Sequence, residues 1–97
     1  MAKFVYLYKG GGMPESEDEG KRLMAAWTSW LGGLDGDLVD GGNPFGASTA
    51  VGGSPSGITG YSIVNAQSID DAKKKADGCP ILEGGRGSVE VYEALPM

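Results

Sequence analysis

The hydrophobic positions of the chain follow two periods, one typical of strands and one typical of helices. Stretches in which aromatic and β-branched residues recur at every second position, between clusters of glycine or proline, predict strands. These stretches are residues 3–9, 37–42, 58–66 and 88–94. Residues 48–51 are expected to form either a further strand or one arm of a hairpin.

The first of these strands is apolar on both sides. Phe4, Tyr6 and Tyr8 share one face, and Val5 and Leu7 share the other, because successive side chains of a strand point in opposite directions. A strand that is apolar on both faces is expected to be covered on both faces.

Two other stretches have the period of an amphipathic helix. The first opens with the capping box of residues 16–19 and is predicted to run to about Gly32. The second opens with a similar cap at residues 68–71 and ends before Gly78, a natural helix-terminating residue. The residues that share the apolar face of the first helix are Leu23, Trp27, Trp30, Leu31 and Leu34.

The resulting order, β-α-β-β-α-β, predicts an α+β fold of the ferredoxin-like type, in a single domain that spans residues 1–97. In this fold both helices lie on one face of an antiparallel sheet. The other face then has no cover within the chain, although the first strand is apolar on that side too. We therefore expect a homodimer, in which a second copy covers the open face.

Composition narrows the chemistry that the chain can support. The 13 acidic and 8 basic residues give a net charge of -5, which argues against a nucleic-acid partner. The chain has no histidine and one cysteine, Cys79, so a disulfide within the chain is excluded, and we expect no metal site and no cofactor. No long apolar run or secretory signal is present, which predicts a cytoplasmic protein without a membrane association.

Seven segments follow one another along the chain in an order that is typical of one protein family. They are residues 4–8, 24–30, 38–45, 60–64, 69–72, 79–80 and 89–93. Together they resemble the YCII-related family of the dimeric α+β barrel superfamily. The resemblance implies a ferredoxin-like subunit whose open sheet face pairs with a second subunit to form a barrel. Some members of the family carry a His–Asp pair that is proposed as an acid/base site. Asp40 matches the Asp of this pair, whereas the histidine has no counterpart.

Four residues are candidates for a functional site. Asp40, near the end of the second strand, can act as a general base beside apolar walls, or it can accept N–H groups of the turn that follows it. Arg86, between glycines, can bind an anionic substrate through two parallel hydrogen bonds, or it can be an exposed loop charge. Trp27 and Tyr61 either line a substrate pocket or pack in the core.

Three functions remain open at this point. The first is a small-molecule site between the Trp-containing helix and the sheet, with cofactor-independent acid/base chemistry of a lyase or isomerase that uses Asp40. The second is a non-catalytic ligand-binding or accessory dimer. The third is a protein-interaction role through the acidic start of the first helix. We expect a small-molecule ligand, and the sequence does not identify it.

Overall fold

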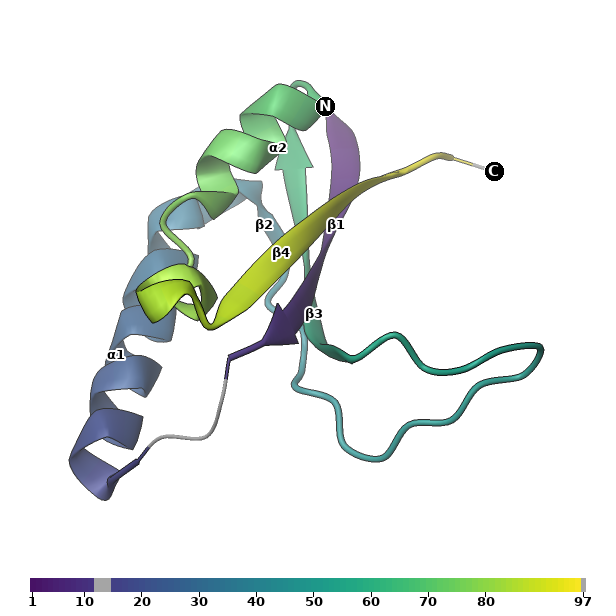
Figure 1. Cartoon of the computed structure of the whole chain (residues 1–97). Helices are drawn as coiled ribbons and strands as arrows, with labels where there is room; N and C mark the ends of the chain where they lie inside the picture. The colour runs from purple at the N-terminus through teal and green to yellow at the C-terminus, as the bar shows by residue number, and fades with distance from the viewer. Residues whose placement is uncertain (12–14, 97) are drawn as a thin grey trace.

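The computed structural model describes residues 1–11 and 15–96, and its main elements follow the predicted order β-α-β-β-α-β (Figure 1). Two short 3-10 helices, η1 and η2, follow α1 and α2 respectively. The elements are β1 (Ala2–Gly10), α1 (Glu17–Leu34), η1 (Asp35–Asp37), β2 (Leu38–Asp40), β3 (Ile58–Ala66), α2 (Ile69–Ala76), η2 (Pro80–Gly85) and β4 (Gly87–Ala94).

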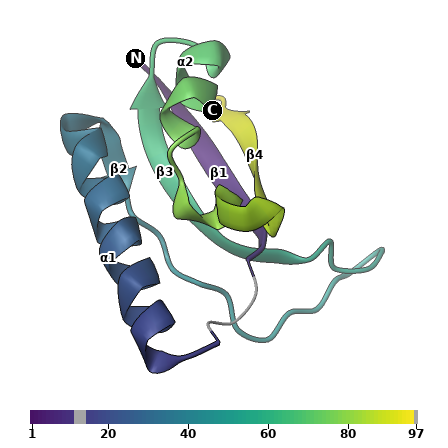
Figure 2. The ribbon, with the colours of Figure 1, turned by 60° about the vertical axis from the view of Figure 1, so that its left-hand side comes forward.

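The four strands form one antiparallel sheet in the order β2-β3-β1-β4. The strands that flank each helix in the sequence are separated in the sheet by one antiparallel strand, which is the split arrangement of a ferredoxin-like fold. Both helices lie on the same face of the sheet (Figures 1 and 2). The predicted fold class is thus confirmed.

Helix α1 begins where the capping box predicts, and it ends later than predicted. The Ser16 hydroxyl accepts the N–H of Glu19 at 3.1 Å, as expected of an N-cap serine. The helix continues through Gly32 and Gly33 to Leu34, which is buried in the core. Because packing stabilises a helix more than local propensity does, the burial of Leu34 extends the helix beyond the glycine pair. The chain leaves the helix at Asp35, where φ is +49°.

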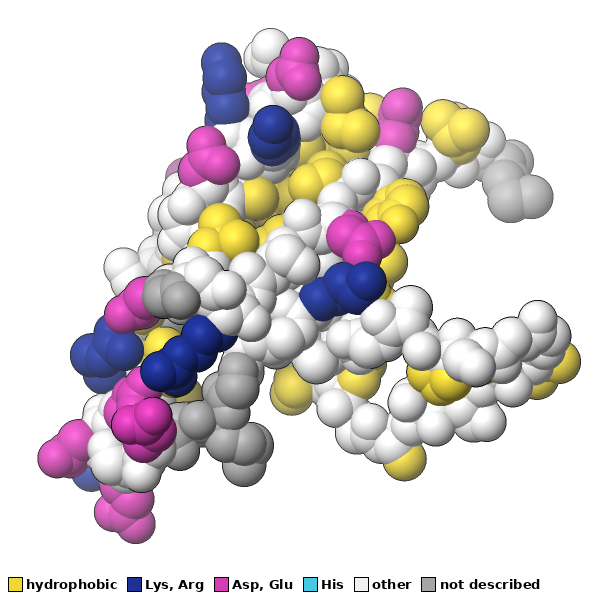
Figure 3. Space-filling model, viewed as in Figure 1, with side chains coloured by type: hydrophobic (Ala, Val, Ile, Leu, Met, Phe, Trp, Pro, Cys, Tyr) yellow, Lys and Arg dark blue, Asp and Glu magenta, His cyan; other side chains and the backbone are white. Residues whose placement is uncertain are grey.

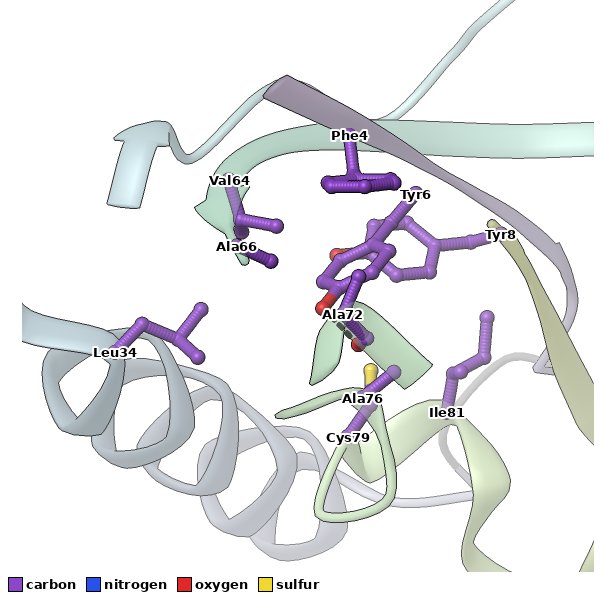
Figure 4. Packing of buried hydrophobic residues seen from close by; sticks show 10 residues of the cluster. All are labelled: Phe4, Tyr6, Tyr8, Leu34, Val64, Ala66, Ala72, Ala76, Cys79 and Ile81. Atoms are coloured by element: carbon purple, nitrogen blue, oxygen red, sulfur yellow. Dashed lines mark hydrogen bonds between the residues drawn. The ribbon is translucent and has the colours of Figure 1, made fainter. Parts of the chain in front are cut away.

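The core lies between the sheet and the helices. Phe4, Tyr6 and Tyr8 project from β1 into this space, as their shared face predicts, and meet α2 and the residues after it (Figure 4). The Tyr6 hydroxyl donates to the carbonyl oxygen of Ala72, which joins the centre of the sheet to α2. Burial, and then the nearby Asp71 and Cys79, raise the pKa of Tyr6 to about 12.

The opposite face of the sheet carries a second apolar surface. Val5 pairs with Ile63, and Leu7 pairs with Tyr61, in the register of β1 and β3. All four side chains are only partly buried, because α1 and α2 both lie on the other face (Figure 2). Beside them, the Tyr92 side chain of β4, which pairs with Val5, is 51% exposed.

The segment between β2 and β3 differs from its prediction in two ways. The predicted strand 37–42 is limited to Leu38–Asp40, and residues 48–51 form neither a strand nor a hairpin arm. Gly42 takes a φ of +78° and turns the chain, and only an isolated bridge between Pro44 and Gly60 follows. Proline has no N–H to continue a ladder, so residues 46–57 leave the sheet as an exposed loop (Figure 1). We call residues 46–57 the arm.

Neither described helix combines the length and the apolarity that a membrane crossing requires.

Candidate functional site

A cavity of about 1070 Å³ lies between α1 and the end of the sheet at which strand β1 ends and strand β3 begins. The turn after β2 and the helix η2 complete its rim. Its size is that of pockets that bind small molecules, which are typically about 300–1,000 Å³. The cavity is partly open to solvent.

Two aromatic residues from different elements form the apolar wall of this cavity. Trp27 of α1 and Tyr8 of β1 both line it, and their rings meet edge to face with centroids 5.1 Å apart. Trp30, which lies outside the lining, meets Trp27 edge to face at 5.7 Å. Such pairs are favourable beyond the area that they bury, so Trp27 is held in place from both sides.

The Tyr8 hydroxyl belongs to a buried chain of hydrogen bonds. It donates to the Ser62 hydroxyl at 2.7 Å, and Ser62 donates to the carbonyl oxygen of Gly41 at 2.7 Å. Burial raises the pKa of Tyr8 above its usual value. A phenol is protonated at neutral pH even without this shift, so the Tyr8 hydroxyl is the donor. The chain joins β1, β3 and the turn after β2, and it fixes one edge of the cavity.

The close approach of the turn after β2 to strand β3, on the same side of the cavity, requires glycine. At Gly42, where φ is +78°, a Cβ atom would overlap the carbonyl oxygen of Tyr61. At Gly60, a Cβ atom would lie 3.2 Å from the carbonyl oxygen of Asn43, tighter than an ordinary contact. The turn after β2 therefore passes close to β3, and the glycines at this edge present backbone to the cavity.

The rim of the cavity carries charge of both signs. Arg22 Nη1 donates to both carboxylate oxygens of Glu83, at 2.9 and 3.2 Å. Arg86 Nη2 lies 3.9 Å from Glu15 Oε1, which is too far for a hydrogen bond. Glu19 Oε2 accepts the N–H of Glu15 at 3.1 Å. Acidic and basic side chains gather around the start of α1 (Figure 3).

Three of the four predicted site residues, Trp27, Tyr61 and Arg86, border this one cavity. The side chains of β3 alternate between the two faces, so the Tyr61 side chain belongs to the face opposite α1 rather than to the aromatic wall. The ring of Tyr61 also stacks on Phe45, with centroids 5.7 Å apart. Arg86 follows η2 and has a side chain that is 55% exposed.

The fourth predicted residue, Asp40, is exposed and is not among the lining residues. Its Oδ1 accepts the N–H of Gly42 at 2.9 Å, which is the turn contact that the sequence offered as the alternative. Its Oδ2 lies 3.4 Å from the Tyr61 hydroxyl. Asp40 thus stands directly beside the rim residues Gly41 and Gly42.

Sequence reasoning did not single out Tyr8, Arg22 or Glu83 for the site. The alternation of β1 places Tyr8 on the helix-facing side of the sheet. It does not show that α1 leaves an open space beside Tyr8. Arg22 adjoins Leu23 at the border of the apolar stripe, which is a signal for a residue at a cavity rim. Glu83 has no comparable signal in the sequence, because its position at the rim depends on the path of η2.

Among residues 1–11 and 15–96, no three His, Cys, Asp or Glu side chains come together in a way that could hold a metal ion. Cys79 is buried, and burial raises the pKa of its thiol to about 11. A thiol that stays protonated is a poor nucleophile and a poor ligand.

Comparison with known proteins identifies the fold. No protein-family model matches the chain, and no curated protein matches its sequence. Among solved structures, the chain is similar to 5-chloro-2-hydroxyhydroquinone dehydrochlorinase (TftG) from Burkholderia phenoliruptrix AC1100, in complex with 2,5-dihydroxybenzoquinone. The TM-score is 0.61 and the identity is 24%, over 93% of this chain and 90% of that chain. This likeness supports the predicted α+β fold of the ferredoxin-like type. The dimeric α+β barrel superfamily and the YCII-related family stay predictions.

Proposed function

We propose that the chain binds a small molecule with a flat ring in the cavity beside α1, and that it does so as a homodimer. The observation that carries this proposal is the cavity itself, of about 1070 Å³, whose apolar wall is the edge-to-face pair of Trp27 and Tyr8. Aromatic side chains favour ring-shaped ligands, because offset-stacked and edge-to-face contacts add to the burial of apolar area.

The structural neighbour suggests which rings to test first. TftG is named as a dehydrochlorinase of a chlorinated hydroxyhydroquinone, and its structure holds 2,5-dihydroxybenzoquinone. Oxygenated and halogenated single rings are therefore the first compounds to screen against this chain, together with a neutral two-ring probe such as 2-naphthol.

Calorimetric titration with 2-naphthol tests the site directly. Trp27→Ala removes the wall that both helix and strand support, and we expect affinity to fall by about tenfold or more. Trp30→Phe is the matched control, because Trp30 is outside the cavity lining and a phenyl ring at this position can still pack against Trp27. Equal loss of affinity in the two variants, or no binding by the parent, would contradict the proposed site.

Acid/base catalysis by Asp40 is the second candidate function. It is favoured by the position of Asp40 next to the rim residues Gly41 and Gly42 and by its contact with Tyr61. Asp40→Asn keeps an oxygen that accepts the Gly42 N–H but removes the basicity. If the parent converts a ring compound from the screen, the Asn variant should bind that compound and not convert it. Equal turnover by both proteins would exclude Asp40 as the base.

The open sheet face supports the proposed homodimer. Val5, Leu7 and Ile63 give this face an apolar centre that the helices of the same chain do not cover. Light scattering at micromolar concentration should give the mass of two chains. Leu7→Lys should give one chain, whereas Val51→Lys, a matched charge on the fully exposed arm, should leave the mass unchanged. A parent that measures as one chain contradicts this part of the proposal.

A further inference from the structure

We propose that the ligand of the cavity carries a carboxylate head group, which binds the guanidinium of Arg22 in the place that Glu83 occupies. The inference rests on the small-molecule site proposed above and specifies the charged end of its ligand. It makes Arg22 the residue that selects an anionic ring compound over a neutral one, and it makes Glu83 an internal competitor of the ligand.

The two arginines at the rim of the cavity have N–H donors that the described residues leave unused. A guanidinium has five N–H donors, and among the described residues Arg22 donates only through Nη1, to Glu83. Its Nε and Nη2 edge makes no hydrogen bond with these residues. Arg86, which lines the same cavity, has its nearest described carboxylate oxygen at 3.9 Å.

The carboxylates of the rim already accept hydrogen bonds from the chain itself. Both oxygens of Glu83 accept from Arg22. Glu19 Oε2 accepts the backbone N–H of Glu15, and the backbone N–H of Glu19 is bound by Ser16, so Glu19 is part of the cap of α1. Each carboxylate of the rim thus already accepts a hydrogen bond, whereas Arg22 keeps N–H groups that donate to no described residue, which favours an anionic ligand over a cationic one.

A ligand carboxylate can replace the Glu83 carboxylate at Arg22. The side chains of Arg22 and Glu83 are 54% and 52% exposed, and ion pairs in such positions contribute little to stability. Glu83 also meets a single nitrogen of Arg22, whereas a free carboxylate can align with two nitrogens in parallel bonds, the stronger geometry. A ligand carboxylate thus gains contacts that Glu83 does not make.

The pair of Arg22 and Glu83 lies at the same cavity as the aromatic wall. Arg22 and Trp27 belong to the same helix and line the same cavity, with Leu23 also in the lining between them. A ring compound that packs against Trp27 can therefore extend a carboxylate along α1 toward its N-terminal half, where the acidic and basic side chains gather.

The test compares two probes that differ in the head group, 2-naphthoate and the neutral 2-naphthol, by calorimetric titration at neutral pH. We expect the parent to bind 2-naphthoate about tenfold tighter, in line with hydrogen bonds to charged groups. Arg22→Gln should remove this preference and leave 2-naphthol affinity unchanged. Glu83→Gln should strengthen 2-naphthoate binding severalfold, because it removes the competing charge.

Lys21→Gln is the matched control, since it removes one exposed positive charge from the adjacent position outside the lining. Its preference for 2-naphthoate should equal that of the parent. Binding of 2-naphthol without a preference for 2-naphthoate, or a preference that survives Arg22→Gln, would overturn the inference and leave the ring-binding site standing. A Glu83→Gln variant that binds 2-naphthoate no more tightly than the parent would overturn the displacement of Glu83. Absence of binding by both probes would overturn the site and the inference together.

Discussion

The space between the helices and the sheet has two ends, and only one of them is filled. Phe4 and Tyr6 of β1 project into the end that α2 covers, and both are almost completely buried. Tyr8, two residues further along the same strand face, borders the cavity instead. Three aromatic residues in one alternating pattern thus have two different surroundings, a packed core and the wall of an open site.

The difference comes from the elements that cover the strand. At the closed end, α2 faces the core with Ala72 and Ala76, whose small side chains allow close approach to the sheet. The indole N–H of Trp30 donates to the carbonyl oxygen of Lys75 at 3.1 Å, which joins α1 to α2 there. At the open end, glycines supply part of the rim, and no side chain of residues 1–11 and 15–96 fills the space that α1 leaves.

The largest expected effect is at the closed end. Phe4→Ala should lower the free energy of unfolding by about 3–5 kcal/mol, because a fully packed site cannot collapse around the missing ring. Leu31→Ala, in the wall of the cavity, should cost about half as much, since Leu31 is only partly buried and borders space that is already open. Urea unfolding of both variants measures the difference. Equal losses would mean that the two ends are packed alike.

A second effect depends on pH. Burial raises the pKa of Tyr6 from 10.0 to about 12 in the folded chain. The folded state then keeps a proton that the unfolded chain loses, so this contribution is complete below pH 10 and is lost as the pH rises toward 12. The loss is about 2–3 kcal/mol, from 1.36 kcal/mol for each pKa unit. Chemical unfolding at pH 9 to 12 measures it.

Tyr6→Phe is the control for this pH dependence. The variant should be less stable than the parent at pH 9, because the bond to Ala72 is gone. The difference between the two proteins should then shrink as the pH approaches 12. A constant difference over this range would show that the Tyr6 phenol is not buried as described.

The smallest expected effect separates the two tryptophans. Trp30→Phe removes the hydrogen bond to Lys75 and should cost about 0.5–1.5 kcal/mol. Trp27→Phe keeps an aromatic ring against Tyr8 and should cost less than Trp30→Phe, because the described chain gives the Trp27 indole N–H no hydrogen bond to lose. Thermal unfolding resolves this order. A larger loss for Trp27→Phe would reverse the assignment of the two residues to open and closed ends.

Periodicity and caps were sufficient to predict the order of elements and the inner face of β1. The residues 58–66 form β3 with the predicted bounds, because their alternation is long and both neighbours in the sheet are strands. The predicted strand at residues 48–51 was wrong for the converse reason. A stretch of four residues becomes a strand only if a sheet edge is within reach, and the turn at Gly42 and Pro44 directs the chain away from the sheet.

The candidate site was harder to predict because it depends on volumes rather than on patterns. Trp27, Tyr61 and Arg86 lie around one cavity, yet no sequence rule states that α1 extends beyond the cover of α2. The placement of Glu83 against Arg22 joins residues 61 positions apart and depends on the path of η2. Such contacts between distant segments follow from the assembled fold, and local propensity carries no information on them.

The pairing of the first and last strands of the chain, β1 and β4, has a consequence for engineering. Lys3 of β1 is the register partner of Ala94 of β4, so the beginning of β1 and the end of β4 lie side by side. The arm at residues 46–57 is exposed throughout. Exposed loop tips tolerate new chain ends. A circular permutant that joins β4 to β1 by a short linker and opens at Val51 should therefore retain the sheet. A reporter domain fused at the new ends would stand apart from the cavity.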